Sequence, residues 1–244
     1  FRQLRLDQWV GSSVAWIPDH ILKLGESPFD MDSLEGRECY GGLDLSSSDD
    51  ISAFVLIFPP EKEDGKYIVL PYFWVPEDTV PLRVKRTSFP YDTWIARGYM
   101  NPTPGNVIDY RYIQHTILDA CRTYQVREIA YDPWHAVQLI NDLSEEGLMM
   151  VEVGQGWKSM SPPSKEFYEQ MMKGRITYGG NPVLRWMCQN VVIEKDPAGN
   201  IKPSKKKSKE KIDGVVATIM ALDRAVRNEA HESVYDERDL LVLY

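Results

Sequence analysis

The chain of 244 residues is 43% apolar and 26% charged, a globular composition that excludes disorder throughout. Its net charge is −8, from 28 basic and 36 acidic residues. The segment 202–211 (KPSKKKSKEK) holds six Lys and one Glu, which leaves 22 basic and 35 acidic residues, a net charge of −13, on the other 234. An acidic body with one basic segment favours a local polyanion contact, or metal-binding carboxylates, over a uniformly basic nucleic-acid surface.

Cysteine usage and hydropathy exclude further classes of protein. Cys39, Cys121 and Cys188 are widely spaced and odd in number, which fits neither a disulfide framework nor a CxxC zinc site and indicates a reducing compartment. No apolar run approaches the ~20 residues that span a bilayer, and the start of the chain lacks the basic and apolar regions of a signal peptide. Because the first residue is Phe, we expect the sequence to be a piece of a longer protein.

The first part of the chain predicts a connector followed by strands. Residues 1–37 mix isolated apolar residues with Pro and Gly and show no sustained period, so we expect a connector packed on the domain. Runs rich in β-branched and aromatic residues follow at 38–45, 51–58 and 66–75. The short turns between these runs predict an antiparallel three-stranded meander.

The middle of the chain predicts helices and parallel strands. Residues 77–125 have a helical pattern with a break at 101–106, and Asp109 is placed to cap a helix that ends near residue 124. Strand, helix and strand at the spacing that follows predict a parallel βαβ unit. Its elements are a buried strand at 126–131, a helix at 134–146 and a strand at 148–153.

The last third predicts three helices and a hairpin. A helix at 164–173 ends at Gly174, and a second helix begins after Asn181, whose side chain can cap it. Two extended pieces around a DPAGN turn at 191–202 predict a hairpin. Residues 210–227 have apolar side chains at helical spacing, which predicts a long amphipathic helix packed on the sheet.

The order of these elements is that of a ribonuclease H-like α/β domain. Such a domain has a mixed sheet, here a three-stranded antiparallel meander plus parallel strands, flanked by helices, with a hairpin insertion near the C-terminus. We expect the domain over residues 38–228, after the connector at 1–37 and before an acidic C-terminal tail at 229–244.

Three aspartates are candidates for functional residues because of their predicted positions in the fold. Asp44 lies inside a strand on the face of Tyr40 and Gly42, and burial of its charge requires a partner or a metal, unless it caps the next turn. Asp132 ends a strand, where ligands collect in open α/β sheets, although Asp-Pro also begins ordinary turns. Asp213 opens the final helix, where an acid also complements the helix dipole.

In a ribonuclease H-like arrangement these three carboxylates converge. Clustered carboxylates repel one another unless a divalent cation neutralises them, and hard oxygen ligands select Mg²⁺ or Mn²⁺. Two such ions, about 3.5–4 Å apart, support phosphodiester cleavage. Asp49 and Asp50 follow the first strand and could add a ligand or a base, although for Asp49 a turn role is favoured.

Three strings, CYGGLDLSSSDDISAFVLIFP, IAYDPWHA and DPAGNIKPSKKKSKEKIDGVVATIMALDRA, resemble the nuclease domain of tailed-phage terminase large subunits, the motors that cut and package viral DNA. The similarity extends over nearly the whole chain from about residue 8. It implies catalytic and metal-binding roles for Asp44, Asp132 and Asp213, and matches an auxiliary acid of some members to Asp50.

The resemblance also implies an activity and its partners. The expected activity is a divalent-metal-dependent endonuclease that uses two Mg²⁺ or Mn²⁺ ions to cut concatemeric double-stranded DNA in the cytoplasm of the infected bacterium. The expected partners are an ATPase domain, a terminase small subunit and a portal. The sequence has no G-x-x-x-x-G-K-[ST] string, so ATP-driven packaging is not expected of this piece.

The lysines of 202–211 are predicted to contact DNA phosphates without reading bases, because point charges neutralise phosphate whatever the sequence. A solvated linker is the alternative. Of these lysines, we expect Lys211 in particular to reach a phosphate at the metal site. For His135, a role at the start of a helix is favoured over a role as a catalytic assistant. The six lysines are Lys202, Lys205, Lys206, Lys207, Lys209 and Lys211.

Two other functions compete with this interpretation. Glu166 and Glu169 stand 34 and 37 residues after Asp132, a spacing compatible with the Asp-Asp-Glu site of a transposase or integrase. Loss of activity on changing Glu166 but not Asp213 to Ala would favour that site. The second alternative is a DNA-gripping module without chemistry, and Mn²⁺-dependent plasmid cleavage that EDTA abolishes would argue against it.

Overall fold

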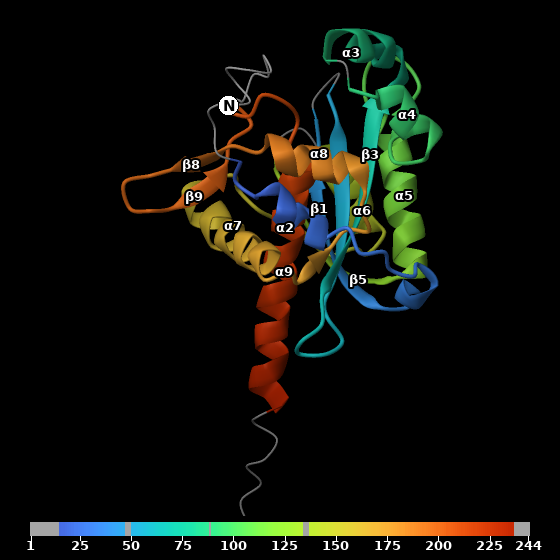
Figure 1. Ribbon diagram of the computed structural model, residues 1–244. Coiled ribbons are helices and arrows are strands. Elements are labelled where there is room, and N and C mark those ends of the chain that lie inside the picture. Colours follow the sequence, from blue (N-terminus) through green and yellow to red (C-terminus); the bar gives the residue numbers. More distant parts are fainter. Residues whose placement is uncertain (1–14, 47–49, 88, 134–136, 237–244) are drawn as a thin grey trace, which may run out of the picture.

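The structure is a computed structural model that describes residues 15–46, 50–87, 89–133 and 137–236, with side chains through residue 228 (Figure 1). Its strands are β1 (Glu38–Asp44), β2 (Ser52–Phe58), β3 (Tyr67–Pro76), β4 (Asn101–Thr103), β5 (Gln125–Tyr131), β6 (Met150–Glu152), β7 (Ile176–Thr177), β8 (Ile193–Lys195) and β9 (Ile201–Pro203). Its helices are α2 (Asp19–Leu24), η1 (Asp32–Leu34), η2 (Glu77–Thr79), α3 (Val80–Thr87), α4 (Tyr91–Ala96), α5 (Tyr110–Thr123), α6 (Val137–Glu145), α7 (Trp157–Met172), α8 (Pro182–Asn190) and α9 (Asp213–Asp236).

A mixed sheet with the strand order β4-β3-β2-β1-β5-β6 forms the centre of the fold, and β7 pairs with β3. The β1–β2 and β2–β3 pairs are antiparallel, which confirms the predicted meander. The β1–β5 and β5–β6 pairs are parallel, which confirms the predicted βαβ unit. The predicted hairpin is also present, as the antiparallel pair β8–β9.

Helices cover both faces of this sheet (Figure 1). Alternation along β1 divides the apolar side chains between two cores: Tyr40 belongs to the core under α9, and Leu43 to the core under α5 and α6. Helix α9 packs against β1, β2 and β5, and its C-terminal part projects beyond the sheet. No helix in the described ranges has both the length and the apolar character needed to cross a membrane.

Gly42 allows α9 to lie unusually close to β1. A Cβ atom at this position would be 2.0 Å from the carbonyl oxygen of Ala217, a distance that no real contact allows. The absent side chain therefore sets the separation of helix and strand. Because α9 begins at Asp213, this close packing also sets how near that residue comes to the end of β1.

The structure differs from the sequence predictions in several elements. The break at 101–106 contains β4, which extends the sheet by pairing in parallel with β3. Helix α7 begins seven residues before the predicted start at residue 164, since buried Met160 and Phe167 hold one face against the core despite Pro162 and Pro163. Helix α9 begins at Asp213, three residues after the predicted start, and runs past residue 227, its predicted end, to Asp236.

Candidate functional site

The carboxyl end of β1 holds two buried carboxylates. Asp44, the last residue of β1, is 1% exposed, and Asp213, the first residue of α9, is 5% exposed. Asp132 follows β5 directly and is partly exposed. The parallel register pairs Leu43 with Tyr131, so Asp44 and Asp132 are the next residues of neighbouring strands at one edge of the sheet.

The ammonium of Lys205 joins Asp44 and Asp213. Its Nζ atom donates a hydrogen bond of 2.8 Å to Asp44 Oδ1 and lies 2.7 Å from Asp44 Oδ2 and 2.8 Å from Asp213 Oδ1. The distance to Asp44 Oδ2 is that of an ion pair, yet this atom receives no hydrogen bond of good geometry from any described residue. One cation therefore compensates two buried carboxylates and leaves one buried oxygen unsatisfied.

The electrostatics of this cluster disfavour uncompensated charge. Burial, together with repulsion from Asp213 and Asp132, raises the pKa of Asp44 to about 7 against the lowering effect of Lys205. Burial lowers the pKa of Lys205, but the two carboxylates that contact it outweigh this effect and hold the pKa well above its usual range. The buried carboxylates of Asp44 and Asp213 thus need a nearby positive charge, and the ammonium of Lys205 provides it.

The residues present fit a divalent cation in their donor chemistry. Asp44 and Asp213 offer carboxylate oxygens, the ligands that Mg²⁺ and Mn²⁺ prefer, and the unsatisfied Asp44 Oδ2 is a buried acceptor beside the shared cation position. Across the described ranges, no three His, Cys, Asp or Glu side chains lie close enough together to hold a metal ion. The arrangement shown here is therefore one in which Lys205 serves as the cation.

Asp50, the predicted auxiliary acid, is engaged with two other basic side chains. Its carboxylate forms an ion pair with Lys211 and lies 3.8 Å from Nη1 of Arg83. The backbone N–H of Ile51 also donates to it at 2.8 Å. These basic partners already compensate the charge of Asp50. Asp49 and His135 lie outside the residues that the structure describes.

The predicted DNA-binding lysines divide by their contacts within the protein. Besides Lys205 and Lys211, which pair with acids of the site, Lys207 lies 3.4 Å from Glu194. The Nζ atom of Lys202 donates to a backbone carbonyl and lies 5.0 Å above a Trp ring. Lys202 therefore has no ion pair but is held by these two contacts, whereas Lys206 and Lys209 form neither an ion pair nor a side-chain hydrogen bond with any described residue.

The structure separates Glu166 and Glu169 from the aspartates. Glu166 lines a cavity together with Glu38, the first residue of β1, whereas Asp44 is the last residue of that strand. At about 3.3 Å per residue, these ends of the strand are roughly 20 Å apart. Glu169 is exposed and pairs with Lys173. Glu166 therefore lies too far from Asp44 to form an Asp-Asp-Glu site with it, although its spacing in the sequence is typical of one.

Sequence reasoning assigned Lys205 to DNA and missed its contact with the carboxylates, which joins residues 161 positions apart. It also missed Arg83, a buried residue of α3 that lies beside Asp50 and over the ring of Tyr91. Contacts between residues this far apart in the sequence leave no local sequence pattern. The only available signal was the unusual burial of acids, which implies nearby cations.

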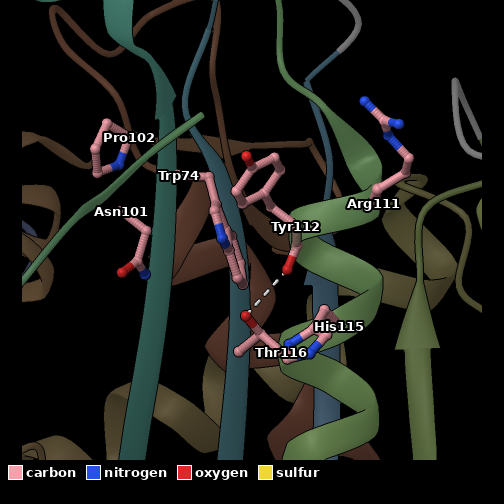
Figure 2. A pocket seen from close by; sticks show the side chains of 7 residues that line it. All are labelled: Trp74, Asn101, Pro102, Arg111, Tyr112, His115 and Thr116. Atoms are coloured by element: carbon pink, nitrogen blue, oxygen red, sulfur yellow. Dashed lines mark hydrogen bonds between the residues drawn. The ribbon is translucent and has the colours of Figure 1, made fainter. Parts of the chain in front are cut away.

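A cavity of about 640 Å³ lies elsewhere, between the β3–β4 edge and α5. Figure 2 shows the Trp74 and Tyr112 rings side by side, with Asn101 and Pro102 across from the residues of α5. Arg111, which also lines the cavity, pairs with the Asp109 cap of α5. Its lining offers no carboxylate, so the cavity does not suit a divalent cation. The seven lining residues are Trp74, Asn101, Pro102, Arg111, Tyr112, His115 and Thr116.

Comparison with known sequences identifies the family of this chain. A model of the terminase large subunit endonuclease domain matches residues 2–229. The chain is 36% identical over 228 residues to the large subunit of the terminase of Enterobacteria phage HK97, covering 92% of this chain and 44% of that protein. It is 35% identical over 215 residues to protein YmfN of Escherichia coli strain K12, covering 84% of this chain and 47% of that protein. The chain thus spans less than half the length of either relative.

Known structures agree with this assignment. The HK97 large terminase crystal structure matches with a TM-score of 0.78 at 35% identity, over 86% of this chain and 43% of that chain. The large terminase nuclease from thermophilic phage G20c, with bound magnesium, matches with a TM-score of 0.54 at 11% identity, over 84% of this chain and 95% of that chain. The latter likeness concerns the fold alone, which is ribonuclease H-like. The chain belongs to the endonuclease-domain family of the terminase large subunits.

Proposed function

We propose that this domain is a divalent-metal-dependent endodeoxyribonuclease that cuts concatemeric double-stranded DNA for viral packaging. The observation that carries the proposal is the meeting of two buried carboxylates, Asp44 and Asp213, around a single cation at the carboxyl end of β1. Such a pair has no evident value for stability alone, because burying like charges is costly. Family membership supports the reaction class.

The proposed cofactor is Mg²⁺ or Mn²⁺, in two ions held by Asp44, Asp132 and Asp213. The magnesium bound in the G20c nuclease supports a divalent ion in this fold. When bound, such ions supply charge stabilisation for hydrolysis of a phosphodiester bond. Asp44 and Asp213 lie on β1 and α9, which pack closely at Gly42, and this packing supports their proposed role as two of the ligands.

The basic segment is proposed to position DNA against this site. Lys206 and Lys209, which have no ion pair within the described part of the chain, are the residues best placed to take phosphates without breaking another contact. Lys211 is held beside Asp50, at the same edge of the sheet as Asp44, and would contact a phosphate closer to the reacting bond. The net negative charge of the rest of the chain repels DNA, which confines DNA binding to the basic segment.

The proposed partners of the full-length protein rest on its membership of the terminase family. The HK97 relative is a terminase large subunit more than twice as long as this chain. We propose accordingly that the domain acts with an ATPase domain, a terminase small subunit and a portal, in the cytoplasm of the infected bacterium. Copurification of full-length protein with the portal and small subunit tests these partners.

The activity is tested by incubating supercoiled plasmid with the purified domain and Mn²⁺. We expect nicked and linear products, their loss on adding EDTA, and their loss in Asp44→Asn and Asp213→Asn. The matched control is Asp223→Asn, which removes another acid of α9 that pairs with Arg227. Cleavage by the Asp44→Asn protein would contradict the proposed site, and metal-independent binding without cleavage would favour the gripping module.

A further inference from the structure

We infer that Lys205 is a built-in competitor of the metal ion: its ammonium occupies the cation position between Asp44 and Asp213, and a divalent ion binds there only when the ammonium leaves. The inference rests on the proposed metal-dependent function and adds a residue that controls metal loading. It assigns to Lys205 a role distinct from that of its neighbours in the basic segment, which the sequence alone does not separate.

The distances make the two cations mutually exclusive. The Lys205 Nζ atom lies 2.7 to 2.8 Å from three oxygens, two of Asp44 and one of Asp213. A Mg²⁺ ion sharing these oxygens, at its preferred distances of about 2.0–2.1 Å, would fall within the volume that the ammonium fills. Like charges so close together in a buried site repel strongly. Metal binding is therefore an exchange of one cation for another.

The surrounding segment favours exchange by side-chain rotation. The backbone on either side of Lys205 is fixed, because Ser204 N–H donates to Val192 O and Ser208 N–H donates to Ser204 O. Ser204 Oγ in turn donates to Glu194 at 2.9 Å, which ties the segment to the β8–β9 hairpin. The Lys205 side chain is nevertheless 50% exposed, so its four-carbon stem has solvent into which it can turn. The ammonium can leave while the loop stays in place.

Exchange has a consequence for affinity. A metal ion must replace a charge-assisted hydrogen bond and two ion-pair contacts before it gains its own ligands. The protein without metal keeps its buried carboxylates compensated, and its affinity for the ion is lower than that of a site with the same ligands but no lysine. Lys205 thus restrains metal loading, and removing it should tighten metal binding.

The direct test measures Mn²⁺ binding to the purified domain without DNA, from the free Mn²⁺ signal in electron paramagnetic resonance. We expect Lys205→Met to tighten binding by at least about tenfold, since loss of a charge-assisted hydrogen bond corresponds to roughly a factor of 10 to 100. Lys206→Met, which removes the same charge from the adjacent exposed residue, should change affinity less than about twofold, as expected for a screened surface charge. Equal effects of the two variants, or no effect of Lys205→Met, would overturn the inference.

A second measurement uses the wild-type protein and does not depend on the folding of a variant. Acetylation of lysines, followed by mass spectrometry, should modify Lys205 more slowly than Lys206 in EDTA, because its ammonium is held by carboxylates. Saturating Mg²⁺ should raise the rate at Lys205 toward that at Lys206. A rate at Lys205 that Mg²⁺ leaves unchanged would refute the exchange.

The same binding assay separates failure of this inference from failure of the proposed function. If wild type binds Mn²⁺, Asp44→Asn does not, and Lys205→Met binds no more tightly than wild type, the metal site stands and the competition is refuted. If wild type and Lys205→Met both fail to bind Mn²⁺, the metal site itself is refuted and the inference falls with it.

Discussion

Replacing Gly42 by Ala is expected to destabilise the domain and to weaken its metal site together. The added Cβ atom would lie 2.0 Å from Ala217 O and 2.9 Å from the Ala221 nitrogen, both backbone atoms of α9. Ordinary contact begins at 3.4 Å, so the helix and strand must separate by more than 1 Å. No rotamer change can relieve this contact, because the clashing atoms are backbone on the helix side.

The magnitude follows from the cost of overpacking a core. Extra methyl groups cost about 1–3 kcal/mol where side chains can adjust, and the rigid contact at Gly42 places this change near or above the upper value of about 3 kcal/mol. For a domain of this size that loss lowers Tm by roughly 6–12 °C, at about 2–4 °C per kcal/mol. Since α9 begins at Asp213, its displacement should also reduce the stabilisation that Mn²⁺ provides.

Thermal unfolding followed by circular dichroism, with and without Mn²⁺, measures both effects. The matched control is Gly154→Ala, because the nearest atom to a Cβ there is Ser159 Oγ at 3.9 Å. That substitution should change stability by no more than about 0.5 kcal/mol. If Gly42→Ala melts at the temperature of Gly154→Ala, the close packing of α9 on β1 does not hold the site together as argued.

Further predictions concern the metal, the DNA contacts, a helix cap and a thiol. Mn²⁺ at 100 times its Kd should stabilise wild type by about 2.7 kcal/mol in thermal unfolding and leave Asp44→Asn unaffected; equal shifts would place the ion elsewhere. Changing Lys206 and Lys209 together to Ala should flatten the plot of log K for DNA against log[salt] by up to about 1.8, at about 0.9 per lost contact, and an unchanged slope would make them solvated linker residues. Asn181→Ala removes the side chain that accepts from two N–H groups of α8 and should cost about 0.5–2 kcal/mol by urea unfolding; a change within error would argue against the cap. Burial raises the pKa of the Cys188 thiol to about 12, so its contribution to stability is full below pH 9 and is lost as pH rises from about 9 to 12, and fast alkylation of native protein at pH 8 would contradict its burial.

Local patterns were sufficient for much of the fold. Alternating and β-branched runs predicted β1, β2, β3 and β5, and the turn residues between them predicted the antiparallel meander. The Asp109 and Asn181 caps were predicted as well, because a cap depends on residues only two or three positions apart. The short strands β4 and β7 were not, since each pairs through only two or three residues with β3, a partner distant in the sequence.

The candidate site divides in the same way. An acid inside an apolar strand, another at a strand end and a third at a helix start could be recognised singly, so Asp44, Asp132 and Asp213 were predicted from sequence as members of one site, and their chemical roles stay predictions. The tertiary structure alone decided that Lys205 lies between two of them and that Glu166 lies at the other end of β1. The reason is physical. An acid inside an apolar segment shows in the sequence that a buried charge must be compensated. Which residue compensates it depends on the packing of segments 161 residues apart in the chain.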